Sequence, residues 1–136
     1  MGRTSYRESV VARDRVSAVS PDGLVEGAPT PGIVRELAFE TKHAALIRSR
    51  AEPSAVTGWH HHGKRDVLGY VVRGRARFEF GPGGAEGTNI EEGGFFFVPA
   101  GLIHRDVNPL DELQELVLSV VGEGPLVVNV DGPPPA

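Results

Sequence analysis

The sequence predicts an all-β protein built as an antiparallel sandwich or barrel. Eighteen glycines and eleven prolines interrupt the chain at short intervals, which suits many short strands and leaves little room for long helices. Between these turn signals lie short runs in which apolar and polar residues alternate, the pattern of a strand with one buried face. No helical segment of the kind that connects parallel strands separates the runs, so the strands are expected to be antiparallel.

The expected strands follow one another along nearly the whole chain. They cover residues 15–19, 33–39, 44–51, 67–72, 76–80, 95–98, 102–107, 113–121 and 126–130. Residues 1–12 are expected to form a loose polar arm, and residues 13–136 a single domain. A helix over residues 109–121 is the alternative for one segment, because Asp111 could cap it. The β-branched second half of that segment favours a strand.

The composition is that of an ordinary globular domain, and it argues against several classes of protein. Hydrophobic residues make up 40% of the chain and charged residues 24%. The net charge of −4 argues against a general nucleic-acid binder. No apolar segment is long enough to span a membrane. The first residues lack the apolar core of a secretory signal, so we expect a cytoplasmic location.

The first group of candidate metal ligands is the histidine run in "TGWHHHGKRD". The chain has no cysteine, so histidine and carboxylate side chains are the remaining ligand types. In a strand, His60 and His62 point to the same side and His61 to the other. Gly63 then permits a sharp turn, and Asp66 follows as a candidate carboxylate ligand. By itself, this run fits polar surface residues as well as it fits a metal site.

A second motif makes a metal site the better interpretation. The stretch "GGFFFVPAGLIHRDVN" reads G-x5-P-x-G-x2-H-x3-N, with Gly93, Pro99, Gly101, His104 and Asn108 at the defining positions. The proline and the second glycine predict a turn between two strands. The histidine then lies early in the returning strand, where it can meet the first two histidines at one point.

These two motifs resemble those of the cupin family. The second motif is matched at every defining position, and the first, usually G-x5-H-x-H-x3,4-E-x6-G, is matched at His60, His62 and Gly74. Residues 75–92, which separate the two motifs, are about as many as a small single-domain cupin has. The resemblance implies an antiparallel jelly-roll β-barrel, the cupin-like double-stranded β-helix. It also implies one divalent metal inside the barrel and a homodimer.

The chain departs from the cupin pattern at two positions. Ser54 stands where the first motif has its leading glycine, and Val67 stands where the spacing from the end of that motif places the glutamate. Asp66 is one residue earlier, and strand alternation turns it away from the histidines unless a turn or a bulge redirects it. A centre of three histidines alone therefore remains open. The predicted ligands are His60, His62 and His104, with Asp66 as a further candidate.

These ligands suit one divalent transition metal, Fe, Mn, Ni, Cu, Zn or Co. The leading functional hypothesis is a mononuclear non-haem metal oxygenase that acts on a small molecule. A Lewis-acid isomerase or hydrolase is an alternative, and so is a non-catalytic module that binds or senses a small ligand. A DNA-binding regulator is disfavoured, because no helix-turn-helix segment accompanies the barrel. The catalytic residues are unassigned; Asp66, Glu79 and Asp106 are candidates for an acid or base only by their proximity in sequence.

Overall fold

Eleven short strands and two single-turn 3-10 helices form the regular structure of residues 11–135, the part of the chain that the computed structural model describes. The helices are η1 (Pro21–Gly23) and η2 (Pro82–Gly84). The strands are β1 (Val25–Glu26), β2 (Val34–Glu40), β3 (Ala44–Ala51), β4 (His60–His61), β5 (Asp66–Arg73), β6 (Ala76–Phe80), β7 (Glu86–Ile90), β8 (Phe95–Val98), β9 (His104–Val107), β10 (Gln114–Val121) and β11 (Val128–Asn129).

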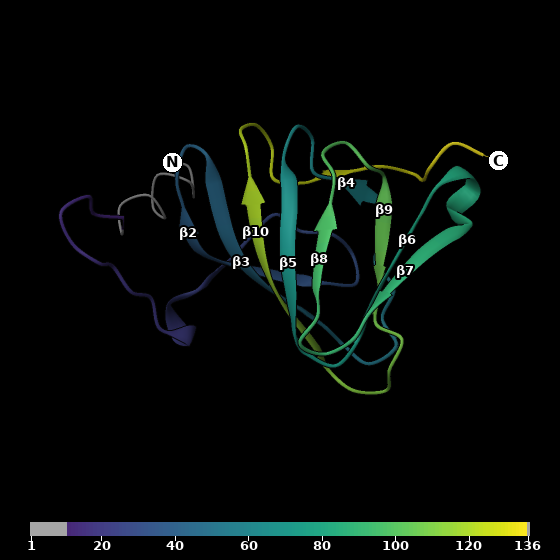
Figure 1. Cartoon of the computed structure of the whole chain (residues 1–136), viewed down its shortest axis with the longest axis horizontal. Helices are drawn as coiled ribbons and strands as arrows, with labels where there is room; N and C mark the ends of the chain where they lie inside the picture. Colours follow the sequence, from purple (N-terminus) through teal and green to yellow (C-terminus); the bar gives the residue numbers. More distant parts are fainter. Residues whose placement is uncertain (1–10, 136) are drawn as a thin grey trace.

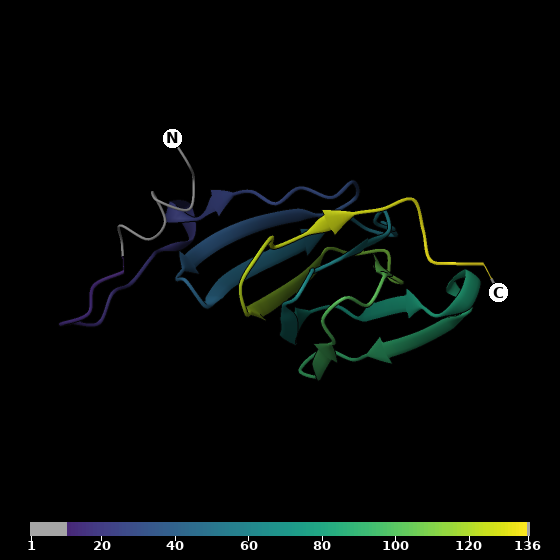
Figure 2. The same ribbon diagram turned by 90° about the horizontal axis from the view of Figure 1, so that it is seen from above.

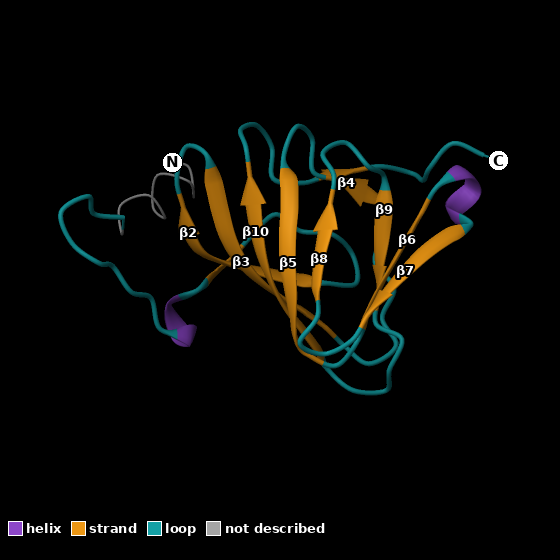
Figure 3. Ribbon diagram, viewed as in Figure 1, coloured by secondary structure: helices purple, strands orange, loops and turns teal. Residues whose placement is uncertain are grey.

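The strands form two antiparallel sheets (Figures 1 and 3). One sheet has the order β1-β2-β3-β10-β5-β8, and the other has the order β11-β4-β9-β6-β7. Neighbours in the sheets are mostly distant in the sequence: β10 pairs with both β3 and β5, and β9 pairs with both β4 and β6. This antiparallel all-β arrangement is the predicted fold class.

The hydrophobic core lies on the inner face of the larger sheet. Alternation along β3 turns Ala45 and Ile47 inward, and alternation along β10 turns Leu116, Leu118 and Val120 to the same side. All five are at most 5% exposed. Burying a valine, leucine or isoleucine side chain stabilises a fold by about 1.5–3 kcal/mol, so this row of side chains fixes which face of β10 points inward.

The two sheets are not joined on the side of β7 and β8. Each of these strands is the last of its sheet, and among residues 11–135 no strand pairing connects them. Part of the interior on this side is filled by Phe96 of β8, whose ring lies over Gly69 of the neighbouring β5 and against the ring of Phe78 on β6. No strand pairing among these residues joins the sheets on the side of β1 and β11 either, so the scaffold is a sandwich and not a barrel closed by hydrogen bonds.

Most of the predicted strands are confirmed, and the errors have simple causes. Residues 44–51, 76–80 and 95–98 are strands with the expected bounds, and residues 114–121 form a strand and not a helix. The strand predicted over 15–19 is wrong: this segment has no partner strand, and Val16 within it is 96% exposed. Strand β7 was not predicted, because "EGTNI" carries almost no apolar residue, as an edge strand exposed at four of its five positions allows.

The N-terminal part of the described chain lies apart from the sheets. In Figures 1 and 2 the segment before β1 extends away from them. Of the predicted arm, residues 1–10 lie outside the described residues. Between residues 11 and 135, neither of the two short helices has the length or the apolar composition needed to cross a bilayer.

Candidate metal centre

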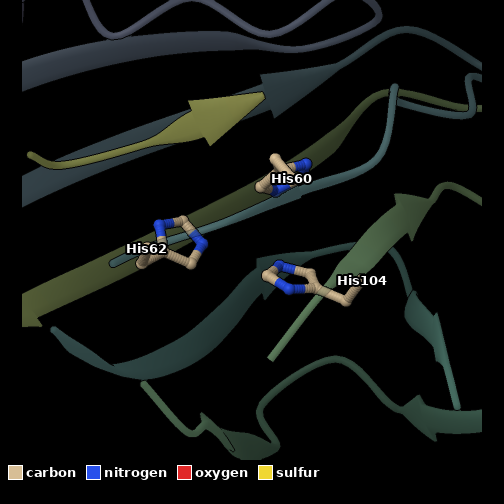
Figure 4. Close-up of side chains that lie close together, drawn as sticks. All are labelled: His60, His62 and His104. Carbon is tan, nitrogen blue, oxygen red and sulfur yellow. The ribbon is translucent and has the colours of Figure 1, made fainter. Parts of the chain in front are cut away.

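Three buried histidines meet between the two sheets (Figure 4). His60 lies on β4, His62 follows directly after that strand, and His104 begins β9. Strands β4 and β9 are paired with His60 opposite His104. One ring nitrogen from each of the three residues lies within 4.8 Å of the other two. The structure therefore brings together the three histidines that the two sequence motifs predict as ligands.

Strand alternation and two turns bring the rings together. His60 and His62 point inward and are at most 4% exposed, whereas His61 between them is half-buried and accepts a hydrogen bond from the Gly63 amide. Gly63 has φ +61°, a left-handed conformation that glycine adopts without strain. The turn before β9 is closed by a hydrogen bond from the Leu102 amide to the Pro99 carbonyl.

Hydrogen bonds fix the protonation of each imidazole. Nδ1 of His60 lies 2.8 Å from the carbonyl oxygen of Gly58, Nδ1 of His62 2.9 Å from that of Leu126, and Nδ1 of His104 2.9 Å from that of Leu102. A carbonyl oxygen only accepts, so each Nδ1 carries the hydrogen and each Nε2 is left with a free electron pair. This is how proteins orient histidines that bind a metal through the other ring nitrogen.

Burial also keeps the histidines in the neutral form that a metal requires. Burial, with smaller contributions from the charges of His104, His60 and Arg35, lowers the pKa of His62 to about 3. Burial likewise lowers the pKa of His104, although Asp106 opposes it. Both side chains are therefore neutral at pH 7 and available as ligands without the loss of a proton.

A carboxylate and a guanidinium group accompany the three rings. Asp106 on β9 is 7% exposed, and its Oδ1 lies 3.4 Å from Nε2 of His60 and 3.6 Å from Nε2 of His104. Burial alone would raise the pKa of Asp106, but His60, His104 and Arg35 together hold it well below its usual value. Arg35 on β2 is 2% exposed and donates from one terminal nitrogen to Ala28 and Thr30. The interior thus contains one anion and one cation in addition to the neutral imidazoles.

The structure does not bring Asp66 to the three histidines. Its Oδ1 accepts a hydrogen bond from the Ala100 amide, and on β5 it lies on the same face as the exposed Leu68 and Tyr70. Val67, at the position of the missing glutamate, points inward but belongs to the hydrophobic core. Glu79, another candidate acid or base, forms ion pairs with Arg77 and Arg105 and also lies away from the rings.

The donor atoms fit a divalent transition metal. His60 Nε2 and Asp106 Oδ1 are fully buried and have no hydrogen-bond partner among the described residues. A buried polar atom without a partner is costly, and here both atoms are electron-pair donors that face each other. Three neutral imidazoles, with an anion beside them, form a set that Fe, Mn, Co, Ni, Cu or Zn accepts.

A largely apolar cavity reaches the histidines from the open side of the sandwich. Its volume is about 870 Å³, and it extends between β6, β7 and β8 to the ring of His104. Phe78, Ile90, Phe96 and Leu102 provide much of its wall, and neither lysine nor arginine lines it. A metal held by the three rings would lie at the inner end of this cavity.

Comparisons with known proteins agree with this architecture. No model of a protein family and no curated protein matches the chain. Among solved structures, the polyketide cyclase RemF from Streptomyces resistomycificus is similar with a TM-score of 0.69 and 17% identity, over 85% of this chain and 86% of that one. An uncharacterized conserved protein with a double-stranded β-helix domain from Klebsiella pneumoniae has a TM-score of 0.67 and 19% identity, over 87% and 98% of the two chains. The chain has the cupin fold.

Other structures with this cupin fold belong to larger proteins. Oxalate decarboxylase from Bacillus subtilis is similar with a TM-score of 0.65 and 23% identity, over 78% of this chain but only 30% of its own. Identities at this level establish the shared fold alone. The function of this chain must therefore be argued from its own site.

The sequence motifs identified the three histidines but missed Arg35. Its signal was nevertheless present, because alternation along "IVREL" places Arg35 on the same side as Ile33 and Leu37. An arginine between two core positions is rare unless it meets a buried anion, which here is Asp106. Asp106 itself was named only as one of three candidate acids or bases.

Proposed function

We propose that this cupin is a mononuclear divalent-metal enzyme that acts on an uncharged, largely apolar small molecule. The observation that carries the proposal is the convergence of three buried imidazoles, each with Nδ1 hydrogen-bonded to a carbonyl, one of which, His104, lines an apolar cavity. His60, His62 and His104 would hold the metal. A bound iron would supply dioxygen chemistry, as in the predicted oxygenase, and a bound manganese or zinc would supply Lewis-acid chemistry.

The residues of the cavity support the choice of substrate. The rings of Phe78 and Phe96, whose centroids are 4.7 Å apart and whose planes are inclined by 43°, form an aromatic wall beside His104. Such walls bind an aromatic or polycyclic body and exclude water from the metal. Because no cationic side chain lines the cavity, a small dicarboxylate would find no counter-charge on its walls, apart from the metal itself.

The structural comparisons support an enzyme with a small-molecule substrate. Proteins of the same fold include an oxalate oxidase, an oxalate decarboxylase and the polyketide cyclase RemF. The cyclase is similar to this chain over most of both lengths, and a polyketide has the apolar, unsaturated body that the cavity favours. A polycyclic phenol or ketone is therefore the first class of substrate to test.

Metal content tests the centre directly. Protein purified without a tag is expected to contain close to one equivalent of transition metal by elemental analysis. His62→Ala or His104→Ala should abolish binding, because each removes an imidazole for which the site has no substitute. His61→Ala is the matched control, since His61 points away from the other rings and should leave the metal content unchanged.

Activity and binding then separate the enzyme from a ligand-binding module. Oxygen uptake by iron-loaded protein should be stimulated by members of a panel of catechols, diketones and hydroxynaphthoquinones, and Phe96→Ala should weaken that stimulation. Binding of these compounds without turnover under any of the six metals would favour the sensing module. A wild-type protein that holds no metal, and whose thermal stability none of the six metals raises, would refute the proposed centre.

A further inference from the structure

The carboxylate of Asp106 lies where the three histidines converge, although neither cupin motif contains it. Asp106 follows His104 by two residues on β9, so strand alternation turns both side chains to the same inner face. The Asp106 side chain is 9% exposed. Thr57 forms two hydrogen bonds with the Asp106 backbone. Its hydroxyl oxygen accepts a hydrogen bond from the Asp106 amide, and its own amide donates one to the Asp106 carbonyl.

The arrangement of protons leaves this carboxylate facing other electron pairs. Nδ1 of His60 and Nδ1 of His104 carry the ring hydrogens, because both donate to carbonyl oxygens. When both rings are neutral, Oδ1 of Asp106 faces two Nε2 atoms that have no hydrogen to give. Neither Oδ1 nor Nε2 of His60 has a hydrogen-bond partner elsewhere among residues 11–135. A cation between these atoms would satisfy all of them at once.

The distances are those between ligands of a single ion. Two ligand atoms that each lie about 2.1 Å from a metal are about 3.0 Å apart at a right angle and about 3.4 Å apart at a tetrahedral angle. Oδ1 of Asp106 is 3.4 Å from Nε2 of His60 and 3.6 Å from Nε2 of His104. Asp106 does not belong to the group of residues whose ligand atoms all lie within 4.8 Å of one another, so its approach to His60 and His104, and not to His62, carries the argument. Two ligands of one ion are at most about 4.2 Å apart at these bond lengths, so the Asp106 carboxylate and the His62 ring must move closer together to bind the same ion.

The two alternative sources of a carboxylate are absent from this point. Val67 occupies the position of the glutamate of the first motif, and the Asp66 carboxylate is bonded to the Ala100 amide. The carboxylate nearest to the histidines is therefore on β9 and not on β5.

We propose that Asp106 is the fourth protein ligand of the metal and binds through Oδ1. The centre has three histidines and one aspartate, and its carboxylate comes from the same strand as the third histidine. This inference rests on the proposed metal centre, because it assigns a ligand to that centre. It differs from a purely supporting function of Asp106, in which the carboxylate would only orient a ring.

Cobalt binding to wild type, Asp106→Asn and Asp66→Asn tests the assignment. The affinity is measured by competition with a chromophoric chelator, and the visible absorption bands of the bound Co(II) report its ligands. Loss of an outer-shell partner typically weakens metal binding about 10–100-fold, so loss of a ligand should weaken it at least about 100-fold. We expect this loss, together with shifted cobalt bands, for Asp106→Asn. We expect neither for Asp66→Asn.

The metal-free proteins show whether each variant folds. In Asp106→Asn the new amide can donate a hydrogen bond to Nε2 of His60, but Arg35 loses its counter-charge, so the metal-free variant should still melt cooperatively, at a lower temperature than wild type. A matching Asp106→Ala variant, which introduces no amide, should show the same loss of cobalt affinity if the missing carboxylate and not the new amide causes it.

The possible outcomes separate the two proposals. If wild type binds cobalt, and Asp106→Asn and Asp106→Ala bind it as tightly with unchanged bands, the assignment of Asp106 is wrong and the three-histidine centre stands. If only Asp66→Asn loses affinity, the carboxylate predicted from the sequence is the ligand instead. If wild type binds no cobalt, both the centre and its fourth ligand are refuted.

Discussion

His62 combines two properties at the scale of the single residue: it is buried, and it must remain neutral. Burial lowers its pKa to about 3, from a value of 6.5 when exposed. Between pH 3 and pH 6.5, His62 is protonated in the unfolded chain but not in the folded chain, so acid favours unfolding. The lowered pKa therefore costs no stability above about pH 6.5, and the protein loses stability as the pH falls from 6.5 toward 3.

We therefore expect the metal-free protein to lose stability on acidification from pH 7 to pH 4. The loss amounts to about 1.4 kcal/mol for each unit of pH over which only the unfolded His62 is protonated. Denaturant unfolding in the presence of a chelator, repeated at several pH values, measures it. Asp106 adds little to the pH dependence between pH 4 and pH 7. Its pKa is lowered from 3.8, so its protonation affects stability only below about pH 4.

A His62→Gln variant provides the control for this pH dependence. It should unfold with a flatter pH profile over the same window, whereas His61→Gln should retain the wild-type slope. Equal slopes in wild type and His62→Gln would contradict the origin that we assign to the acid sensitivity.

Strand alternation and a turn between neighbouring strands made the positions of the histidines predictable from the sequence. His60 and His62 share a face because a strand alternates, and the Pro99–Gly101 turn returns His104 to the neighbouring strand. Strand alternation along β5 also turns Asp66 away from the histidines, as expected. The hydrogen-bond partner of Asp66 was not predictable, because the Ala100 amide is 34 residues away and such a contact leaves no periodic pattern in the sequence.

Strand β5 illustrates how packing within an element depends on one small residue. Gly69 lies directly beneath the ring of Phe96, and a Cβ at this position would overlap that ring. Phe96 in turn contacts Phe78 and lines the cavity beside His104. The absence of a side chain at Gly69 therefore determines where the aromatic wall of the cavity lies.

We predict that Gly69→Ala destabilises the protein by about 1–3 kcal/mol, the usual effect of overfilling a core. The displaced ring should also weaken binding of any aromatic compound that the cavity accepts. Thermal and denaturant unfolding measure the first effect, and ligand titration the second. Gly58→Ala is the matched control, because a Cβ there meets no atom closer than 3.7 Å. A stable Gly69→Ala with unchanged binding would contradict the packing described here.

The elements themselves were predictable where they are buried on one face. Strands β3, β6 and β8 coincide with their predicted bounds because apolar and turn-forming residues mark both ends. Strand β7 is held by pairing with β6 alone and is exposed at four of its five positions, so burial imposes little pattern on its sequence. Residues 15–19 have a β-type composition, yet composition cannot supply the neighbouring strand that they lack.

The larger sheet presents an uncharged apolar surface at the scale of the whole molecule. Leu68, Tyr70 and Val72 on β5 lie on its outer face, each at least 38% exposed, and Phe95 and Phe97 continue this surface onto β8. The rings of Tyr70 and Phe95 are 4.9 Å apart. On the same face, nearer to β2, the charges of Glu36, Arg48 and Glu115 are already paired with one another. Exposed apolar side chains that adjoin in this way often mark a surface of interaction with another protein.

We expect this surface to form the predicted homodimer. Two copies of a chain with net charge −4 repel each other, so contact is favoured where the surface is apolar, and a two-fold axis sets the same surface on both partners.

Light scattering after size exclusion should give twice the chain mass of 14.5 kDa. The double variant Leu68→Thr and Tyr70→Thr should shift the mass to that of the monomer. Threonine is polar but β-branched, so it removes apolar surface and still suits a strand. Val16→Thr removes an even more exposed apolar side chain outside this surface and should remain dimeric. A dimer that survives the double substitution would place the interface on another face, and a monomeric wild type would refute the dimer itself.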